Sequence, residues 1–236
     1  MDVLKSSFSL LAGHWRCAAL EGGVFFVGLI SAGIVLRYRI GFLAAFPSWL
    51  VGKLSKFLSG NPGVLSLFFV IVVFNSCAMF VYMMTGTLLH LLPTIICFLT
   101  GMNIGIVSGA MPAIAMAPVK REEETESSDS VEPSAGETNA LSEATARAGL
   151  RRQLVTMSVV ALLELPAFWF AVAMGTTLPM VWTLKSGAAF VEGLAPFITA
   201  YATVIVPVLT ISAFVEALGI RFTLTARSET DSGRQP

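Results

Sequence analysis

Glu164 is the residue most able to do chemistry, because it is the only charged side chain in the apolar stretch 154–184. A carboxyl deep in a bilayer costs about 2.5–3.5 kcal/mol on insertion scales, so it must face other helices, be protonated or pair with a donor. Asn75 and Asn103 lie in other apolar stretches and are its expected partners. Pro166 marks an expected helix break, because proline removes a backbone N–H. A structural hydrogen bond and a proton or substrate relay are both compatible with this polar site.

The other reactive side chains form no catalytic, cofactor-binding or metal-binding pattern. His14 and His90 occur without an HExxH motif and without the Cys/His spacing of a zinc site. The three cysteines, Cys17, Cys77 and Cys97, are odd in number and lie in apolar sequence, so they are expected to be reduced packing residues. No P-loop and no GxGxxG sequence is present. We therefore expect a protein without enzymatic activity, cofactor or metal.

The composition is typical of a membrane protein. The 236 residues carry 15 Lys and Arg against 15 Asp and Glu, and only 13% are charged, whereas soluble domains average about 25%. Apolar residues make up 55%, and the mean hydropathy is +0.78. These values exclude a disordered chain, an ordinary soluble enzyme and a basic nucleic-acid-binding protein. The lipid bilayer is therefore the first expected partner.

Long uncharged stretches predict about five membrane-spanning helices. Residues 57–119 contain no charged side chain, and about 20 apolar residues suffice to cross a bilayer. Pro93 and residues 85–87 indicate a break that divides this stretch into two spans. A closed barrel would show alternating polarity, which the continuous apolar run from Val64 lacks, so the chain is predicted to be all-α. The predicted spans, within one helical membrane domain of residues 1–220, are 17–38, 63–84, 88–111, 154–178 and 191–217.

The segments outside the spans differ in character. Residues 42–58 place apolar side chains at helical spacing, which favours an amphipathic helix at the membrane interface over a soluble connecting helix. Residues 118–149 are rich in acids, Ser, Thr, Pro and Gly, and cannot bury enough apolar surface to offset their ordering entropy. This segment is predicted to be a disordered acidic loop, and residues 225–236 a disordered tail.

The distribution of Lys and Arg predicts the orientation in the membrane. With five spans, three of the 15 basic residues fall on one side and twelve on the other, and basic residues favour the cytoplasmic side. The acidic loop 118–149 and the C-terminus are therefore expected in the cytoplasm, with the protein in the plasma membrane. Glu216 lies at the cytoplasmic end of the last span, where it can reach the interface or pair with Arg221.

Gly101, Gly105 and Gly109 repeat every four residues along one face of the third predicted span. Small residues in this register let two helix backbones approach closely, which strengthens dispersion contacts and weak hydrogen bonds. The spacing therefore predicts a tightly packed helix pair. The partner is either another helix of the same chain or a helix from a second copy or another subunit.

Three sequence blocks, in order over residues 63–111 and 154–220, carry a family pattern. They are Phe74-Asn75 followed by Gly86, Pro93 and Met102-Asn103-Ile104-Gly105; then Leu163-Glu164-Leu165-Pro166-Ala167; then Ala213-x-x-Glu216-Ala217. Together they resemble the stage II sporulation protein M family of integral membrane proteins. The chain departs from that family at Val159-Val160-Ala161, where the family often has Pro-His-Gly, and at Ile104, where it has Gly.

The resemblance implies a function in assembly. The sporulation member of the family is a membrane scaffold for wall hydrolases, and relatives occur in bacteria and archaea that form no spores. We therefore expect a non-enzymatic scaffold or assembly subunit of a membrane complex, with other membrane subunits or further copies of itself as partners. The alternative is a transporter or permease-like subunit in which Glu164, Asn75 and Asn103 line a polar path.

Overall fold

The computed structural model describes residues 2–38, 62–115, 158–181 and 186–232, together with 40, 45, 49, 52–53, 56–57 and 60. For residues 109–115 and 223–232 it describes the backbone alone. The predicted amphipathic helix at 42–58 falls largely outside the described residues, and the predicted acidic loop at 118–149 falls wholly outside them. The described part of the chain is all-helical, as predicted.

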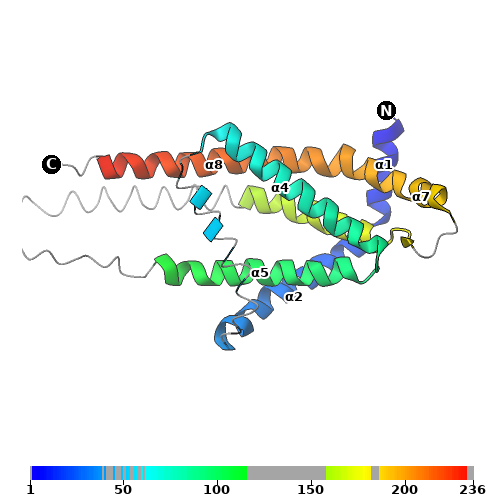
Figure 1. Ribbon diagram of the computed structural model, residues 1–236, viewed down its shortest axis with the longest axis horizontal. Helices are drawn as coiled ribbons and strands as arrows, with labels where there is room; N and C mark the ends of the chain where they lie inside the picture. The colour runs from blue at the N-terminus through cyan, green and yellow to red at the C-terminus, as the bar shows by residue number, and fades with distance from the viewer. Residues whose placement is uncertain are drawn as a thin grey trace, which may run out of the picture.

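The helices form a bundle that is elongated along α8 (Figure 1). One helix, Ser158–Gly175, carries no label in the figure and is here called the central helix. The other elements are α1 (Asp2–Gly13), α2 (Trp15–Tyr38), α4 (Val64–Met84), the 3-10 turn η1 (Thr85–Thr87), α5 (Leu92–Ala115), α7 (Gly187–Ala200), the π-helical turn η3 (Tyr201–Ile205) and α8 (Val206–Ser232).

Within the described residues, four helices are long and apolar enough to cross a membrane, which indicates a membrane protein. They are Trp15–Tyr38, Val64–Thr87, Ser158–Gly175 and Gly187–Phe222, and each falls on a span predicted from the sequence. The remaining predicted span, 88–111, coincides with α5. The apolar part of α5, Leu92–Ser108, is shorter than the four others, so the number of five spans stays a prediction.

The two prolines that were expected to break helices behave differently. Pro93 is the second residue of α5, where a first-turn N–H has no partner within the helix, so it lies at the expected division. Pro166 lies inside the central helix, which continues through it to Gly175. The expected break at Pro166 is therefore wrong. One missing backbone hydrogen bond is tolerated where neighbouring helices pack around the segment.

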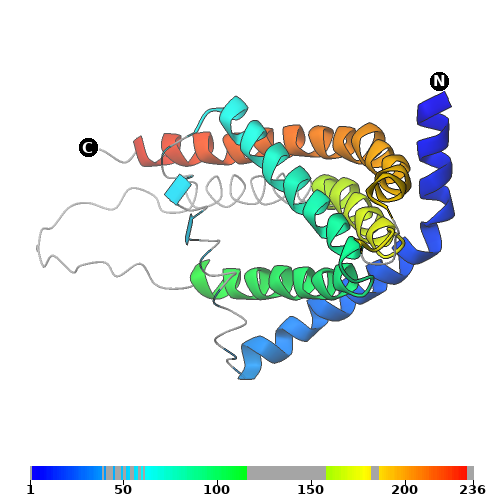
Figure 2. The same cartoon turned by 45° about the vertical axis from the view of Figure 1, so that its right-hand side comes forward.

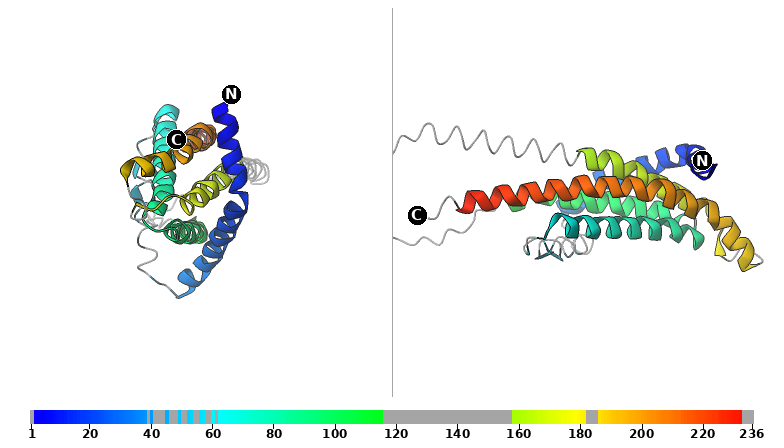
Figure 3. Two further views of the ribbon diagram at one scale, coloured as in Figure 1. Left: turned by 90° about the vertical axis from the view of Figure 1, so that its right-hand side faces the viewer. Right: turned by 90° about the horizontal axis from the view of Figure 1, so that it is seen from above.

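The last span contains a bend. In η3 the N–H of Val206 bonds to the carbonyl of Tyr201, five residues earlier, which is the widened hydrogen-bond pattern of a π-helix. Pro207 follows and has no N–H to offer the preceding turn. α7 consequently curves away from the line of α8, as the view from above shows (Figure 3).

α8 extends to Ser232, well beyond the predicted end of the span at residue 217. Residues 225–232 are therefore helical, where the sequence analysis expected a disordered tail, and residues 233–236 lie outside the described residues. Hydropathy predicts where the apolar span ends, but it does not predict where the helix itself ends. Residues with adequate helix propensity, such as Ala226 and Arg227, can continue the backbone hydrogen-bond ladder into water.

α1 is a helix that the sequence analysis did not predict, because its 12 residues are too few to cross a bilayer. It lies across one end of the bundle at a steep angle to α8 (Figure 2) and packs against α7. Leu11 is buried in the core, and buried Ser7 accepts a hydrogen bond from the Thr203 hydroxyl of η3 at 3.0 Å. Phe8 points away and is exposed. This end of the molecule is called the α1 end below.

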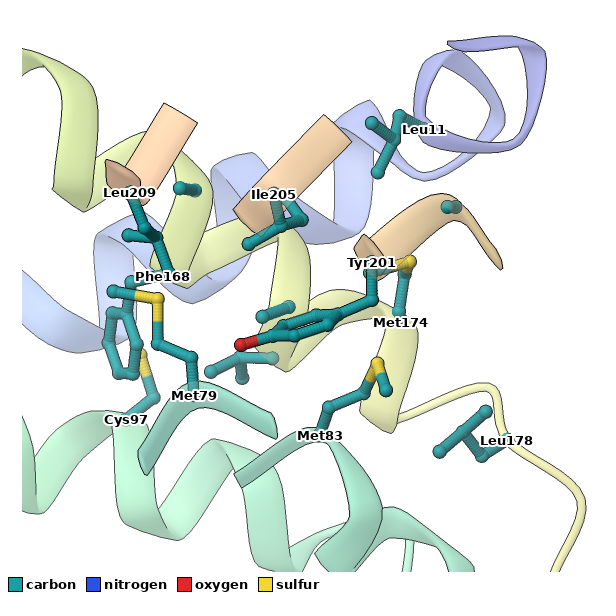
Figure 4. Close-up of a cluster of buried hydrophobic side chains, with 14 of the residues drawn as sticks. Leu11, Met79, Met83, Cys97, Phe168, Met174, Leu178, Tyr201, Ile205 and Leu209 are labelled. Atoms are coloured by element: carbon teal, nitrogen blue, oxygen red, sulfur yellow. The ribbon is translucent and has the colours of Figure 1, made fainter. Parts of the chain in front are cut away.

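The central helix is enclosed by its neighbours. Ala171, Val172, Ala173 and Met174 have no exposed surface. Side chains from α1, α2, α4, α5, α7, η3 and α8 pack against it in one large apolar cluster, part of which is shown in Figure 4. The central helix is therefore the element around which the described part of the bundle is organised.

α2 and α5 pack closely and run in the same direction. Glu21 contacts Thr94 near the start of both helices, and Ala32 lies beside Gly105 further along. A smaller apolar cluster continues this seam toward their C-terminal ends. α4, which lies between them in sequence, returns the chain to the α1 end, so the parallel direction is what an up-and-down membrane topology requires.

Candidate functional site

The structure brings Asn75 and Glu164 together in the middle of the bundle. The Asn75 side-chain amide on α4 donates a hydrogen bond from Nδ2 to Oε1 of Glu164 on the central helix, at 3.0 Å. Both side chains are partly buried. The bond links segments 89 residues apart in sequence and gives the carboxyl the partner that burial in hydrocarbon demands.

α8 adds two more polar side chains beside this pair. Ser212 is fully buried, and its hydroxyl lies beside the Glu164 carboxyl without completing a hydrogen bond. Glu216, one helical turn further along α8, is close enough to Glu164 for the two carboxyls to interact electrostatically. The predicted pairing of Glu216 with Arg221, five residues later on α8, stays a prediction. Three helices thus surround one carboxyl-rich cluster.

Asn103 does not belong to this cluster. The polar neighbours that the structure gives to Glu164 are Asn75, Ser212 and Glu216. Asn103 lies partly buried on α5, two residues from Gly101 and therefore on the opposite side of that helix from the glycines. Of the three residues predicted to form the polar site, Asn75 and Glu164 lie together. Ser212 and Glu216 of α8 complete the cluster.

The glycines of α5 pack against α2 of the same chain. A Cβ placed at Gly101 would collide with the carbonyl oxygen of Phe25, and one placed at Gly105 would lie 2.5 Å from Cβ of Ala32. Gly28 of α2 makes the reciprocal approach to the backbone of α5. The surroundings of Gly109 lie outside the described residues. Over its described part, the row of glycines on α5 therefore packs against a helix of the same chain, not against another subunit.

Glu21, near the start of α2, is a second buried carboxyl. It is only 6% exposed, and its Oε1 accepts a hydrogen bond of 2.6 Å from the Thr94 hydroxyl of α5. The Cys97 thiol donates to the Glu21 backbone carbonyl at 3.3 Å. Oε2 has no hydrogen-bond partner within the described residues. The signal was present in the sequence, because a span that begins at residue 17 places residue 21 inside it.

His14 and His90 both form hydrogen bonds to the turn that follows the central helix. His14 shares a hydrogen bond with the Thr177 hydroxyl at 2.9 Å, and His90 Nε2 bonds to the Leu178 carbonyl at 2.7 Å. No group of three His, Cys, Asp or Glu side chains among the described residues could hold a metal ion. Cys17, Cys77 and Cys97 are all free.

The chemistry open to the Asn75–Glu164 cluster is hydrogen bonding and proton exchange. A carboxyl that receives one amide hydrogen bond and faces a second carboxyl can release or accept a proton.

No protein-family model, no curated protein and no solved structure matches this chain. The class that the fold and the candidate spans define is thus an all-helical membrane protein with buried carboxyls between its helices.

Proposed function

We propose that the chain is a non-enzymatic integral membrane protein that acts as a scaffold or assembly subunit of a membrane complex, similar to stage II sporulation protein M. The observation that carries this proposal is the outer face of α4. Only 11% of that span is buried within the molecule, against 28–39% of the other three candidate spans. A membrane subunit that assembles with others needs one helix whose side chains its own chain leaves uncovered.

The uncovered face of α4 has the shape of a docking surface. An open apolar groove of about 700 Å³ runs along it. Its lining residues are Phe69, Val70, Val73, Phe74, Cys77, Ala78, Val81 and Tyr82. Helix association in lipid depends on van der Waals packing of this kind, because lipid tails are as apolar as the side chains. We propose a second copy of the chain as the first occupant of this groove.

Cys77 makes the proposal directly testable, because it is exposed and lies in the groove. Membranes that contain the chain with Cys17→Ser and Cys97→Ser are treated with a mild oxidant, and disulfide-linked dimers are counted on a non-reducing gel. We expect dimers through Cys77, and no dimers when Cys77→Ser is added. Absence of dimers, together with a monomeric chain free of other subunits in mild detergent, would contradict the assembly function.

A second candidate function is favoured by the cluster of Asn75, Glu164, Ser212 and Glu216. In a transporter or permease-like subunit these side chains would form part of a polar path, with Glu164 as the proton or substrate relay. Burying a carboxyl in the membrane costs free energy, and a role in proton or substrate transfer gives a reason for retaining it. Only this candidate requires Glu164 to exchange its proton.

For the orientation we propose that the C-terminus and the loop 118–149 lie in the cytoplasm and that the membrane is the plasma membrane. The excess of Lys and Arg on that side supports this. The α1 end of the bundle then faces the outside.

A further inference from the structure

A hollow of about 390 Å³ opens at the α1 end, between α2, the turn before α5 and the end of the central helix. Its polar lining consists of Cys17, Glu21, His90, Thr94 and Thr176. No Lys or Arg is among the residues that line it. The hollow lies at the opposite end of α4 from Val64 and does not include the Asn75–Glu164 cluster or the α4 groove.

The carboxyl of Glu21 is incompletely paired within this lining. Glu21 is only 6% exposed, Oε1 accepts a hydrogen bond from the Thr94 hydroxyl, and Oε2 has no partner within the described residues. A buried carboxylate oxygen without a donor costs free energy, because it has given up water and gained nothing in return. This position therefore calls for a donor that the described part of the chain does not supply.

The two threonine hydroxyls and the imidazole of the hollow already use their hydrogens in hydrogen bonds, and the Cys17 thiol is only a weak donor. Thr94 donates to Glu21, and the Thr176 hydroxyl donates to the Ala173 carbonyl at 2.8 Å. A carbonyl can only accept, so the hydrogen in the 2.7 Å contact with Leu178 lies on Nε2 of His90, and Nδ1 of the neutral ring is an acceptor. The hollow thus presents acceptors, namely a carboxylate, two hydroxyl oxygens and an imidazole nitrogen.

We propose that this hollow binds a primary ammonium group, with Glu21 as its counter-ion. An ammonium carries three donors and one positive charge, which matches a set of acceptors around a carboxylate. An anion would be repelled. The described residues offer no three His, Cys, Asp or Glu side chains close enough to hold a metal ion. The hollow is also much larger than the volume of about 30 Å³ that one water occupies, so it has room for an organic amine.

The place of the hollow suits two sources of this group. The hollow opens at the end of the bundle where α2 begins at Trp15, and lipid headgroups lie at the ends of membrane-spanning helices. The ammonium can therefore come from a soluble amine or from a phosphatidylethanolamine headgroup. This inference does not depend on the assembly function proposed above.

The test measures the unfolding midpoint of the full chain in nanodiscs. The probes are ethanolamine in buffer with phosphatidylcholine discs, and discs that contain phosphatidylethanolamine without added amine. A probe at 100 times its Kd is expected to raise the midpoint by about 5 °C or more. A rise with ethanolamine assigns the site to soluble amines, and a rise only with phosphatidylethanolamine assigns it to the lipid headgroup.

Three variants identify the site. Glu21→Gln can still accept from Thr94 but turns a donor toward the hollow, so the rise is expected to disappear. Glu192→Gln, an exposed carboxyl on α7, is the control and keeps the full rise. Thr176→Val removes one acceptor at nearly constant volume, and is expected to weaken ethanolamine binding about fivefold, which keeps the proposal testable if Glu21→Gln does not fold. No rise in the wild type with either probe, or an equal rise in Glu21→Gln, would overturn it.

Discussion

Glu164 and Glu21 show how single carboxyls are accommodated inside this bundle. Each receives one hydrogen bond from a different neighbouring helix, Asn75 of α4 for Glu164 and Thr94 of α5 for Glu21. Each carboxyl therefore ties two helices together, which is one way in which polar groups contribute to association in lipid.

The Asn75–Glu164 bond can be tested by two substitutions of Glu164. Glu164→Gln keeps an acceptor oxygen for Asn75 and should unfold at nearly the wild-type midpoint. Glu164→Leu leaves the amide unpaired and should lose about 0.5–2 kcal/mol of stability, the range measured for polar contacts between membrane helices. Thermal unfolding in detergent measures both. Equal stability of the two variants would show that the bond contributes nothing.

The same Glu164→Gln variant separates the two candidate functions. If the chain carries a proton-linked flux, the variant should abolish it in proteoliposomes, because an amide cannot exchange a proton, while dimers through Cys77 persist. An assembly subunit keeps its whole activity. A Glu164→Gln chain that fails to accumulate would make Glu164 a structural residue and would remove the main support for transport.

At the scale of single residues, the sequence identified Glu164 and its partner Asn75 but not the other side chains of the cluster. A lone acid in an apolar stretch signals an intramembrane site, and Asn75 lies in the middle of a predicted span. Ser212 and Glu216 were missed as partners because they depend on the rotation of α8, which hydropathy does not encode. Glu21 was missed because it lies at the border of an apolar run.

Among the elements, the α2–α5 pair shows backbone contact made possible by glycine. Gly101 and Gly28 each bring a helix against the partner's backbone, with no space for a side chain. The glycine spacing predicted such a pair correctly over its described part. It could not say whether the partner was α2 or another copy, because both present the same kind of surface.

Gly101→Ala tests this packing. The new Cβ meets the Phe25 carbonyl, part of a backbone that cannot move aside without separating the helices, so a loss of about 1–3 kcal/mol is expected. Gly33→Ala on α2 is the matched control, because its Cβ meets open space and alanine is the better helix former. Comparison of unfolding midpoints checks both. A control that loses as much as Gly101→Ala would rule out the packing explanation.

For the whole molecule, hydropathy located the four candidate spans of the described residues, while α1 and the bend at η3 became visible only in the structure. α1 is short and partly charged, so nothing distinguishes it from a connecting segment. The bend arises from a local change in hydrogen-bond register near Pro207, which a count of apolar residues does not detect. Hydropathy indicates how long an apolar segment is and whether it suits lipid or water. The position of α1 and the bend at η3 depend instead on tertiary contacts.

The orientation has a direct test. A cysteine introduced at Ser134, in a chain whose own cysteines are replaced by serine, is expected to react with a membrane-impermeant thiol reagent only after cells are opened. The reason is the excess of Lys and Arg on the side of the loop 118–149. Reaction in intact cells would reverse the orientation, and the hollow at Glu21 would then open to the cytoplasm.

The enclosure of the central helix has a consequence for biosynthesis. This helix is made after α2, α4 and α5 have left the ribosome, yet all three donate side chains to the apolar cluster around it. The early helices therefore cannot complete their packing until the later one arrives. In the interval their inner faces, including the Asn75 amide, lie against lipid or against whatever factor guides insertion. The bundle closes only when Glu164 enters the membrane and gives that amide its acceptor.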